Sequence, residues 1–457
     1  MKVRSLITGA ACALLALSAC DSETPEPPRV ETLSGPLVGL SLDDHPDGGV
    51  FRGVPFATPP VGALRWHAPH PVEAWSVERP AQSFAPACMQ TRSIVDWYGD
   101  IAEAFGQSRA VAPEPEGVSE DCLYLNVWTP DLSPDEPAPV MVYIHGGSYT
   151  GGWSYEPNYH GDAFADQGIV LVSIAYRLGA FGYIAPDTDN ATANAGLLDQ
   201  IAALEWVQAN IGRFGGDSDQ VTIFGESAGA AAVGALLASP AAEGLFHRAI
   251  SQSGGFEFDA DRPAQTAHDA FDQLANALND DPYDASADAI LDTAADVLSG
   301  YDYGPVHGPD ELPVSPRSAL ESGALNLVPL MIGTNRDEWR MYVDAAALEQ
   351  SLEGWRAQLG DARVDRLLTE EGSALGALDH LETARWMRCP GQALARGASA
   401  QGAPVFLYRL ERAREDAPDS LRVYHGAELP YVFDTHDDWL PTAEADRALT
   451  GVMHESW

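Results

Sequence analysis

VTIFGESAG (Val221 to Gly229) is the stretch of sequence that decides the fold of this chain. Its apolar first half predicts a buried strand and the Ala-rich residues behind it predict a helix, so Ser227 stands at a sharp turn between the two. Gly225 and Gly229 suit a strained turn because they carry no Cβ. The helix start behind Ser227 also places positive dipole where a negatively charged oxygen would form. The pattern is that of a nucleophile elbow.

Upstream of the elbow lies a glycine loop that suits an oxyanion hole. Residues 140–144 predict a buried strand, which runs directly into HGGSY (His145 to Tyr149). A loop of this kind leaves backbone N–H groups free to point at a developing negative charge. His145 opens the loop, and we expect it to organise the backbone rather than to transfer protons. The expected N–H donors are Gly147, Ser148 and Ala228, with Gly146 as a further candidate.

Downstream of the elbow lie an acid and a histidine that can complete the site. Residues 328–333 predict another buried strand, and TNRDE (Thr334 to Glu338) follows at its carboxyl end. Glu338 can orient a histidine from there, with Asp337 as its rival, whereas Glu226 beside the serine is expected to be a buried structural acid. The histidine is His425, in a polar loop ahead of an apolar run. The other candidates, which lack this context, are His307, His436 and His454.

The order serine, acid, histidine is the chain order of α/β-hydrolases. It predicts an α/β fold with a mostly parallel central sheet and helices on both faces. The length of 457 residues would by itself suggest two or three domains. Because motifs from Gly146 to His425 must converge on one site, we expect a single large domain instead.

Four longer motifs occur in a fixed order along the chain. They are FRGVPFATPPVGALRW (Phe51 to Trp66), EDCLYLNVWTP (Glu120 to Pro130), NAGLLDQIAALEWVQANIGRFGGDSDQVTIFGESAG (Asn194 to Gly229) and HGAELPYVF (His425 to Phe433). With these motifs the chain resembles the type-B carboxylesterase and cholinesterase family. The resemblance runs from about Leu33 to the last residue. It implies an α/β-hydrolase that hydrolyses carboxylic esters of small molecules.

The resemblance also implies a mechanism and a set of residues. Ser227, Glu338 and His425 would form a Ser-His-Glu triad that works through an acyl-enzyme, without a metal or organic cofactor. An unperturbed histidine has a pKa of about 6.5, so activity is expected to fall as the pH drops through about 6 to 7. Cys88 and Cys122 would form the first disulfide of the family. Some cholinesterase relatives are non-catalytic adhesion or binding proteins, and retention of the three triad residues argues against that alternative here.

The chain departs from the family pattern at three places. Trp339 follows the acid where a small residue is usual, and Ser148 stands in the glycine loop where Gly or Ala is usual. Both substitutions are expected to narrow the pocket. Family members continue beyond the helix expected near Thr442, which leaves open that the domain, ending here at Trp457, is truncated at its C-terminus.

The N-terminus predicts export. Residues 1–19 have the basic start and the short apolar run of a signal peptide, and LSAC (Leu17 to Cys20) resembles a bacterial lipobox, in which Cys20 is acylated. Residues 20–32 would then form an acidic, Pro-rich tether, and 33–457 the hydrolase domain. The expected product is a lipoprotein held at a membrane only by its lipid. The alternative is ordinary cleavage near Ala19 and a soluble secreted or periplasmic protein.

Cysteine usage and charge limit the remaining possibilities. Cys389 is left over after pairing and is expected to be a buried packing residue, and no CxxC or Cys/His cluster suggests a metal. Lys and Arg number 26 against 67 Asp and Glu, a formal net charge of −41. Nucleic acid is therefore excluded as a partner, because phosphate binding needs a basic face. No oligomeric state follows from the sequence.

Overall fold

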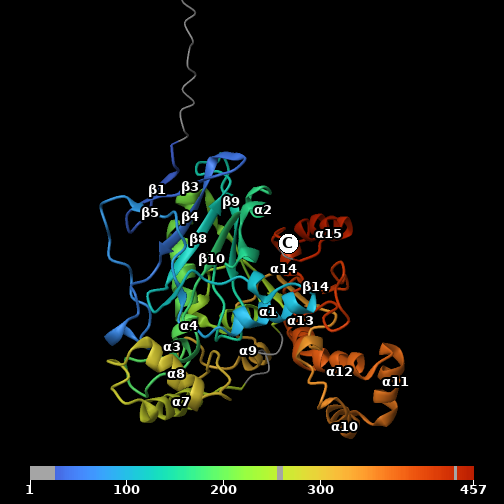
Figure 1. Cartoon of the computed structure of the whole chain (residues 1–457). Helices are drawn as coiled ribbons and strands as arrows, with labels where there is room; N and C mark the ends of the chain where they lie inside the picture. Colours follow the sequence, from blue (N-terminus) through green and yellow to red (C-terminus); the bar gives the residue numbers. More distant parts are fainter. Residues whose placement is uncertain (1–25, 255–260, 437–439) are drawn as a thin grey trace, which may run out of the picture.

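The computed structural model describes residues 26–254, 261–436 and 440–457. Its core is a nine-stranded sheet in the order β14-β13-β12-β11-β9-β10-β8-β4-β3 (Figure 1). The strands from β14 to β10 run parallel, and β8, β4 and β3 continue the sheet antiparallel. The predicted α/β-hydrolase architecture, with its mostly parallel sheet, is confirmed. The strands of this sheet are β3 Leu40–Leu42, β4 His45–Pro55, β8 Tyr124–Thr129, β9 Ala138–Ile144, β10 Val170–Ile174, β11 Gly216–Glu226, β12 Arg248–Gln252, β13 Leu330–Asn335 and β14 Val405–Leu410.

Continuous apolar runs in the central strands explain why the sheet is covered on both faces. In β9, Val140, Val142 and Ile144 point into one core, while Met141 and Tyr143 point into the core on the opposite face. Side chains of a strand alternate between the two faces, so a continuous apolar run is buried on both. This pattern makes β9 and its neighbours central strands.

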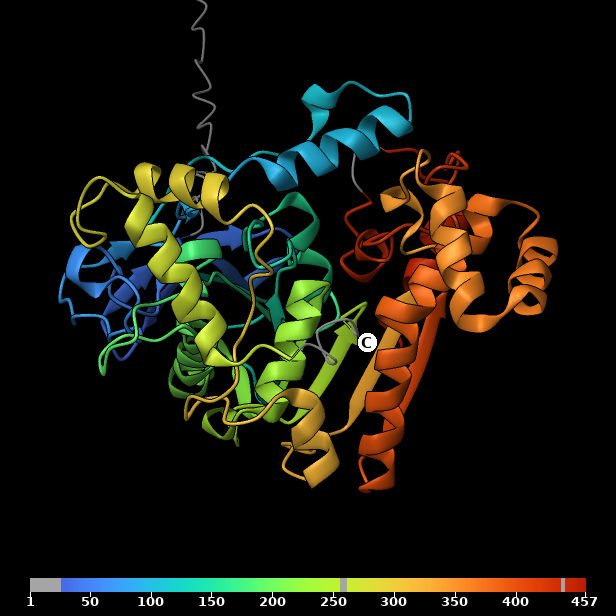
Figure 2. The ribbon, with the colours of Figure 1, turned by 90° about the horizontal axis from the view of Figure 1, so that it is seen from below.

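Helices pack on both faces of the sheet. On one face α5 lies against β11 and β12, and α13 lies against β13 and β14 (Figure 2). The opposite face is covered by α2 and by apolar residues of α14 and α15. The helices are α1 Ser93–Ala104, α2 Asp162–Ala165, α3 Gly179–Gly182, α4 Ala195–Asn210, α5 Ala228–Ala238, α7 Ala264–Ala277, α8 Ala287–Val297, α9 Pro316–Ser322, α10 Leu348–Leu359, α11 Asp361–Glu371, α12 Ala374–Thr383, α13 Cys389–Ala400, α14 Leu429–Val432 and α15 Glu444–His454.

Two groups of helices lie outside this layered body. Helices α7 and α8 form a small core with Trp66, and α10 to α12 form another around Leu352 and Val364 (Figure 1). Short 3₁₀ and π segments complete the fold at η1 Gly62–Leu64, η2 Arg109–Val111, η3 Pro157–Tyr159, η4 Ile211–Phe214, η5 Pro240–Ala242, η6 Arg340–Tyr342 and η7 Ala384–Arg388.

The folded body begins earlier than residue 33, the predicted start of the hydrolase domain. Strand β1 (Arg29–Glu31) pairs antiparallel with β2 (Pro36–Val38), and β2 pairs with β5 (Arg79–Pro80). Val30 is buried in the main core, which explains why the end of the predicted tether is ordered. The remaining short strands are β6 Ala87–Cys88 and β7 Val118–Ser119. The predicted signal peptide and Cys20 lie outside the described residues.

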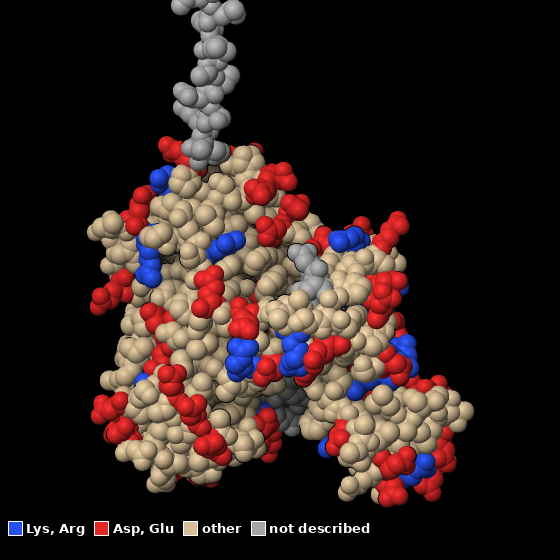
Figure 3. Space-filling view, in the orientation of Figure 1, with Lys and Arg blue, Asp and Glu red and all other residues tan. Residues whose placement is uncertain are grey.

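On the face seen in Figure 3, Asp and Glu side chains are scattered over the surface, with arginines among them and uncharged surface between. Within the described ranges, no helix is both long enough and apolar enough to cross a bilayer. The same ranges contain no group of three or more His, Cys, Asp or Glu side chains arranged to hold a metal ion.

Candidate active site

The elbow at Ser227 is built by close backbone packing. Ser227 follows β11 directly, adopts φ 57° and ψ −123°, and is the N-cap of α5. A Cβ on Gly229 would lie 2.0 Å from the carbonyl oxygen of Ile144, and one on Gly225 would lie 2.5 Å from the backbone of Gly229. Only glycine fits at both positions, so the sequence forces the helix start against the end of β9. The positive φ of Ser227 is the strained conformation that such a turn requires.

The glycine loop lies directly beside this serine. A Cβ on Gly146 would lie 2.8 Å from the carbonyl oxygen of Glu226 and 3.1 Å from Cβ of Ser227, so the loop packs directly on the elbow. Gly147, Ser148 and Tyr149 all have positive φ values, of 107°, 54° and 58°. None of the N–H groups of Gly146, Gly147 and Ser148 donates a hydrogen bond to another described residue. The loop therefore presents unpaired backbone donors at the elbow, as an oxyanion hole requires.

Glu338 and His425 meet beside the elbow although 87 residues separate them. His425 Nδ1 and Glu338 Oε2 are 2.6 Å apart. The other carboxylate oxygen of Glu338 accepts hydrogen bonds of 2.5 Å from Ser253 Oγ and from the backbone N–H of Asn335. The carboxyl group is fully buried but has three donors around it, which fixes its orientation and that of the imidazole.

Two further buried acids lie near His425, and the sequence analysis assigned neither to the site. Glu226 is buried, as expected, and its Oε1 lies 3.3 Å from His425 Nε2, so this acid also contacts the imidazole. Glu428 accepts hydrogen bonds from Gln252 at 3.2 Å and from Asn335 at 2.5 Å. The motif HGAELPYVF, which contains Glu428, was the one sequence signal that could have indicated it.

These acids change the titration of the site. Burial raises the pKa of Glu226 to about 8, and burial with the charge of Glu338 raises that of Glu428 to about 6. For His425, burial lowers the pKa, but the carboxylates of Glu226 and Glu338 outweigh it and raise the pKa to about 10. The value of an isolated imidazole therefore does not describe this histidine.

The rival residues lie elsewhere or have other partners. His307 pairs with Asp261 at 2.7 Å, while His436 and His454 contact Thr450 and Val432. Asp337 is buried and holds the histidine loop through its backbone N–H and a carboxylate oxygen, both bonded to Val423. His145 stacks on Tyr176 and its Nδ1 lies 2.9 Å from the carbonyl oxygen of Gly146. Burial lowers the pKa of His145 to about 4, which fits the expected structural role.

Three tryptophans, Trp97, Trp153 and Trp339, differ in how close they lie to His425. Trp153 is 2% exposed and packs with Tyr155, so it belongs to a core. Trp97 lies close to Gly426 and donates a hydrogen bond of 3.1 Å to the hydroxyl of Tyr342. The ring centroids of Tyr342 and His425 are 6.2 Å apart. Trp339 stacks on Trp386 at 5.7 Å and points toward η7. Trp97 therefore borders the histidine, whereas Trp339 packs on a neighbouring helix.

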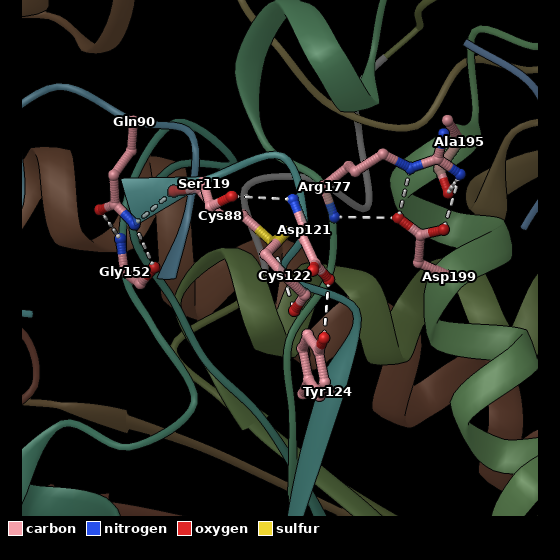
Figure 4. The surroundings of a disulfide bond; sticks show 10 residues. All are labelled: Cys88, Gln90, Ser119, Asp121, Cys122, Tyr124, Gly152, Arg177, Ala195 and Asp199. Carbon is pink, nitrogen blue, oxygen red and sulfur yellow. Dashed lines mark hydrogen bonds and ion pairs between the residues drawn. A yellow bond between two sulfur atoms is a disulfide. The ribbon is translucent and has the colours of Figure 1, made fainter. Parts of the chain in front are cut away.

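Cys88 and Cys122 form a disulfide in the structure, with an S–S distance of 2.04 Å (Figure 4). This pairing agrees with the family resemblance. Cys389 is free but exposed, so the expectation of a buried packing residue is wrong. It is the first residue of α13, and its side chain is exposed while the adjacent Pro390 is buried.

The fold and the elbow define an α/β-hydrolase, and three kinds of comparison give its family. The profile described as "Carboxylesterase family" matches residues 26–457. Para-nitrobenzyl esterase of Bacillus subtilis is 35% identical over 432 residues, covering 89% of this chain and 84% of the relative. Liver carboxylesterase 1 of Mus musculus is 34% identical over 474 residues, covering 92% of this chain and 82% of the relative.

Solved structures agree with these sequence matches. A PNB esterase superposes with a TM-score of 0.79 at 31% identity, and a carboxylesterase of Geobacillus stearothermophilus with 0.78 at 32%. Each match covers 94% of this chain and 89% of the other. The chain belongs to the carboxylesterase family, and its activity is that of a carboxylesterase.

Proposed function

We propose that the protein hydrolyses small carboxylic esters through an acyl-enzyme on Ser227, with His425 as base and Glu338 as its orienting acid. One arrangement supports this proposal above all. The bonded pair of Glu338 and His425 lies at the elbow that carries Ser227, and the loop of unpaired N–H groups packs on the same residue. Nucleophile, base and charge-stabilising donors are thus gathered in one place.

The reaction follows from these roles. His425 takes the proton of Ser227 Oγ through Nε2, and the serine oxygen attacks the ester carbonyl. The carbonyl oxygen becomes negatively charged and is stabilised by the N–H groups of Gly147, Ser148 and Ala228, with Gly146 adjacent. The imidazolium returns the proton to the leaving alcohol. Water then repeats the attack on the acyl-enzyme and releases the acid.

One movement of the imidazole is needed for the first step. Nε2 faces Glu226, and among the described residues no hydrogen bond joins it to Ser227 Oγ. Since Glu226 and Ser227 are consecutive, a small rotation about the Glu338 hydrogen bond redirects Nε2 toward the nucleophile. Catalytic hydrogen bonds commonly tighten only when substrate is bound.

The test compares hydrolysis of a short-chain p-nitrophenyl ester by the native protein and by Ser227→Ala. We expect kcat/KM to fall by about 10⁴-fold or more, because the nucleophile is lost. Ser239→Ala is a matched control, since Ser239 is also buried and is the C-cap at the opposite end of α5. Equal rates for the native protein and Ser227→Ala would reject the esterase mechanism and favour a non-catalytic binding protein.

We also propose that the protein is exported and anchored by a lipid on Cys20, with no other contact with the membrane. The lipobox-like LSAC (Leu17 to Cys20) and the disulfide support export, because disulfides form in oxidising compartments. Cleavage without acylation would instead give a soluble secreted or periplasmic esterase.

A further inference from the structure

Gln90 pairs with the backbone of Gly152, just beyond the glycine loop, through a buried side-chain amide (Figure 4). Its Nε2 donates to the carbonyl oxygen of Gly152 at 2.8 Å, and its Oε1 accepts from the N–H of Gly152 at 2.9 Å. One side chain thus satisfies both polar groups of a buried backbone unit, as a neighbouring strand would. Because buried backbone groups need hydrogen-bond partners, the position of the Gly152 backbone depends on the position of the Gln90 amide.

Gly152 in turn is packed against the start of the oxyanion loop. A Cβ on Gly152 would lie 2.5 Å from the carbonyl oxygen of Gly146, and one on Gly147 would lie 2.2 Å from that of Gly151. The N–H of Gly151 also donates to the carbonyl oxygen of Gly147 at 3.0 Å. The loop therefore doubles back on itself, and Gly151 and Gly152 cannot move without displacing Gly146 and Gly147.

The disulfide holds Gln90 from the other side. Gln90 Nε2 also donates to the carbonyl oxygen of Cys88 at 3.1 Å, and Cys88 is bonded to Cys122. Cys122 lies two residues before β8, whose first residues pair with the end of β10. The antiparallel direction of β8 brings its start to the carboxyl edge of the parallel strands, where the elbow also lies. Gln90 thus stands between a covalent anchor and the oxyanion loop.

We propose that Gln90 is a positioning residue for the oxyanion hole, fixing the N–H donors of Gly147 and Ser148 through Gly152, with the Cys88–Cys122 disulfide fixing Gln90 in turn. The inference rests on the proposed function, because it needs these donors to bind the developing oxyanion. Misplaced donors weaken binding of the transition state more than binding of the ester itself. The expected signature is a loss of kcat at a nearly constant KM.

The test uses Gln90→Met, which keeps the length of the side chain and removes its polar groups. We expect kcat to fall by about 10- to 100-fold, less than the roughly 10²- to 10³-fold loss seen when an oxyanion donor is removed outright. KM should change by less than about 3-fold. The inhibition constant of a trifluoromethyl ketone, whose adduct with serine carries an oxyanion, should rise by the same factor as kcat/KM falls.

Gln208→Met is the matched control. Gln208 lies on α4, away from the loop. Its side-chain amide also donates to backbone carbonyl groups, that of Ser218 at 3.0 Å and that of Leu245 at 2.9 Å. Its kcat and its ketone inhibition constant should match those of the native protein. If Gln90→Met does not fold, Gln90→Asn, which retracts the same groups by one methylene, should show the same pattern to a smaller degree.

A second experiment tests the disulfide. Cys88 and Cys122 are both replaced by alanine, once in the native protein and once in Gln90→Met. Because both changes act on one contact, the combined variant should be no slower than the slower of the two. Multiplying effects would show that the disulfide acts by another route. Native kcat in Gln90→Met, or a lower kcat with unchanged ketone affinity, would overturn the role of Gln90. Failure of the esterase mechanism itself would appear separately, as equal rates for the native protein and Ser227→Ala.

Discussion

Replacing Glu226 by glutamine should extend esterase activity to lower pH. The two charges involved are close and buried: Glu226 Oε1 lies 3.3 Å from His425 Nε2, and the side chains are only 7% and 9% exposed. A negative carboxylate at this distance stabilises the imidazolium and so raises its pKa. The base must be neutral to accept the serine proton. Removing the negative charge therefore lets His425 act at a lower pH.

The size of the shift follows from Coulomb's law. At 3.3 Å and an effective dielectric constant between about 20 and 80, the pair interacts by about 1 to 5 kcal/mol. This corresponds to a fall of about 1 to 4 units in the pKa of His425. Glu226 itself has a pKa of about 8, so its negative charge, which stabilises the imidazolium of His425, develops as the pH rises through that value. The native profile should climb over a broad pH range, and Glu226→Gln should show one ionisation at lower pH.

The assay is kcat/KM for a p-nitrophenyl ester between about pH 5 and 10, corrected for spontaneous hydrolysis. Glu205→Gln is the control, because it removes the same charge from an exposed position on α4. Its profile should coincide with the native one. The reasoning is refuted if folded Glu226→Gln has the native acid limb, or one displaced to higher pH.

Two further predictions concern the cysteines. Non-reducing peptide mapping should find Cys88 linked to Cys122, while Cys389, being exposed, should react with a thiol reagent in the folded protein; a free Cys88 in oxidised protein would reject the pairing. The full-length protein should partition with membranes and carry an acyl mass on Cys20, and Cys20→Ser should lose that lipid. An unmodified Cys20 in the mature native protein would contradict the lipobox.

The sequence was sufficient for the parts of the fold that depend on local pattern. The continuous apolar run before Ser227 could only be a strand buried on both faces, and the glycines around it left one conformation for the turn. The pairing of Glu338 with His425 is not local. It was predictable because the fold places the carboxyl ends of parallel strands at one edge, where both residues had to arrive.

The features that the sequence did not indicate depend on which residues meet in three dimensions. Nothing in the spacing of Glu226 indicates that Nε2 of an imidazole 199 residues later faces its carboxylate, as the structure shows at 3.3 Å. Cys389 looked like a core residue because free cysteines usually are, yet its side chain is exposed at the start of α13. Val30, which the composition placed in a predicted tether, lies in the core, and composition alone cannot indicate this.

The hydrogen bonds of the three buried acids explain how they share the charge near His425. Glu338 is met by three donors, from Ser253, Asn335 and His425, and Glu428 by two. Glu226 Oε1 accepts no hydrogen bond from any described residue, and its pKa of about 8 exceeds the value of about 6 for Glu428. Burial raises the pKa of Glu226 most and the neighbouring acids add to it, whereas for Glu428 the hydrogen bond from Asn335 offsets part of the same effects. Glu226 therefore takes up a proton at a higher pH than Glu428, and this protonation removes part of the negative charge that raises the pKa of His425.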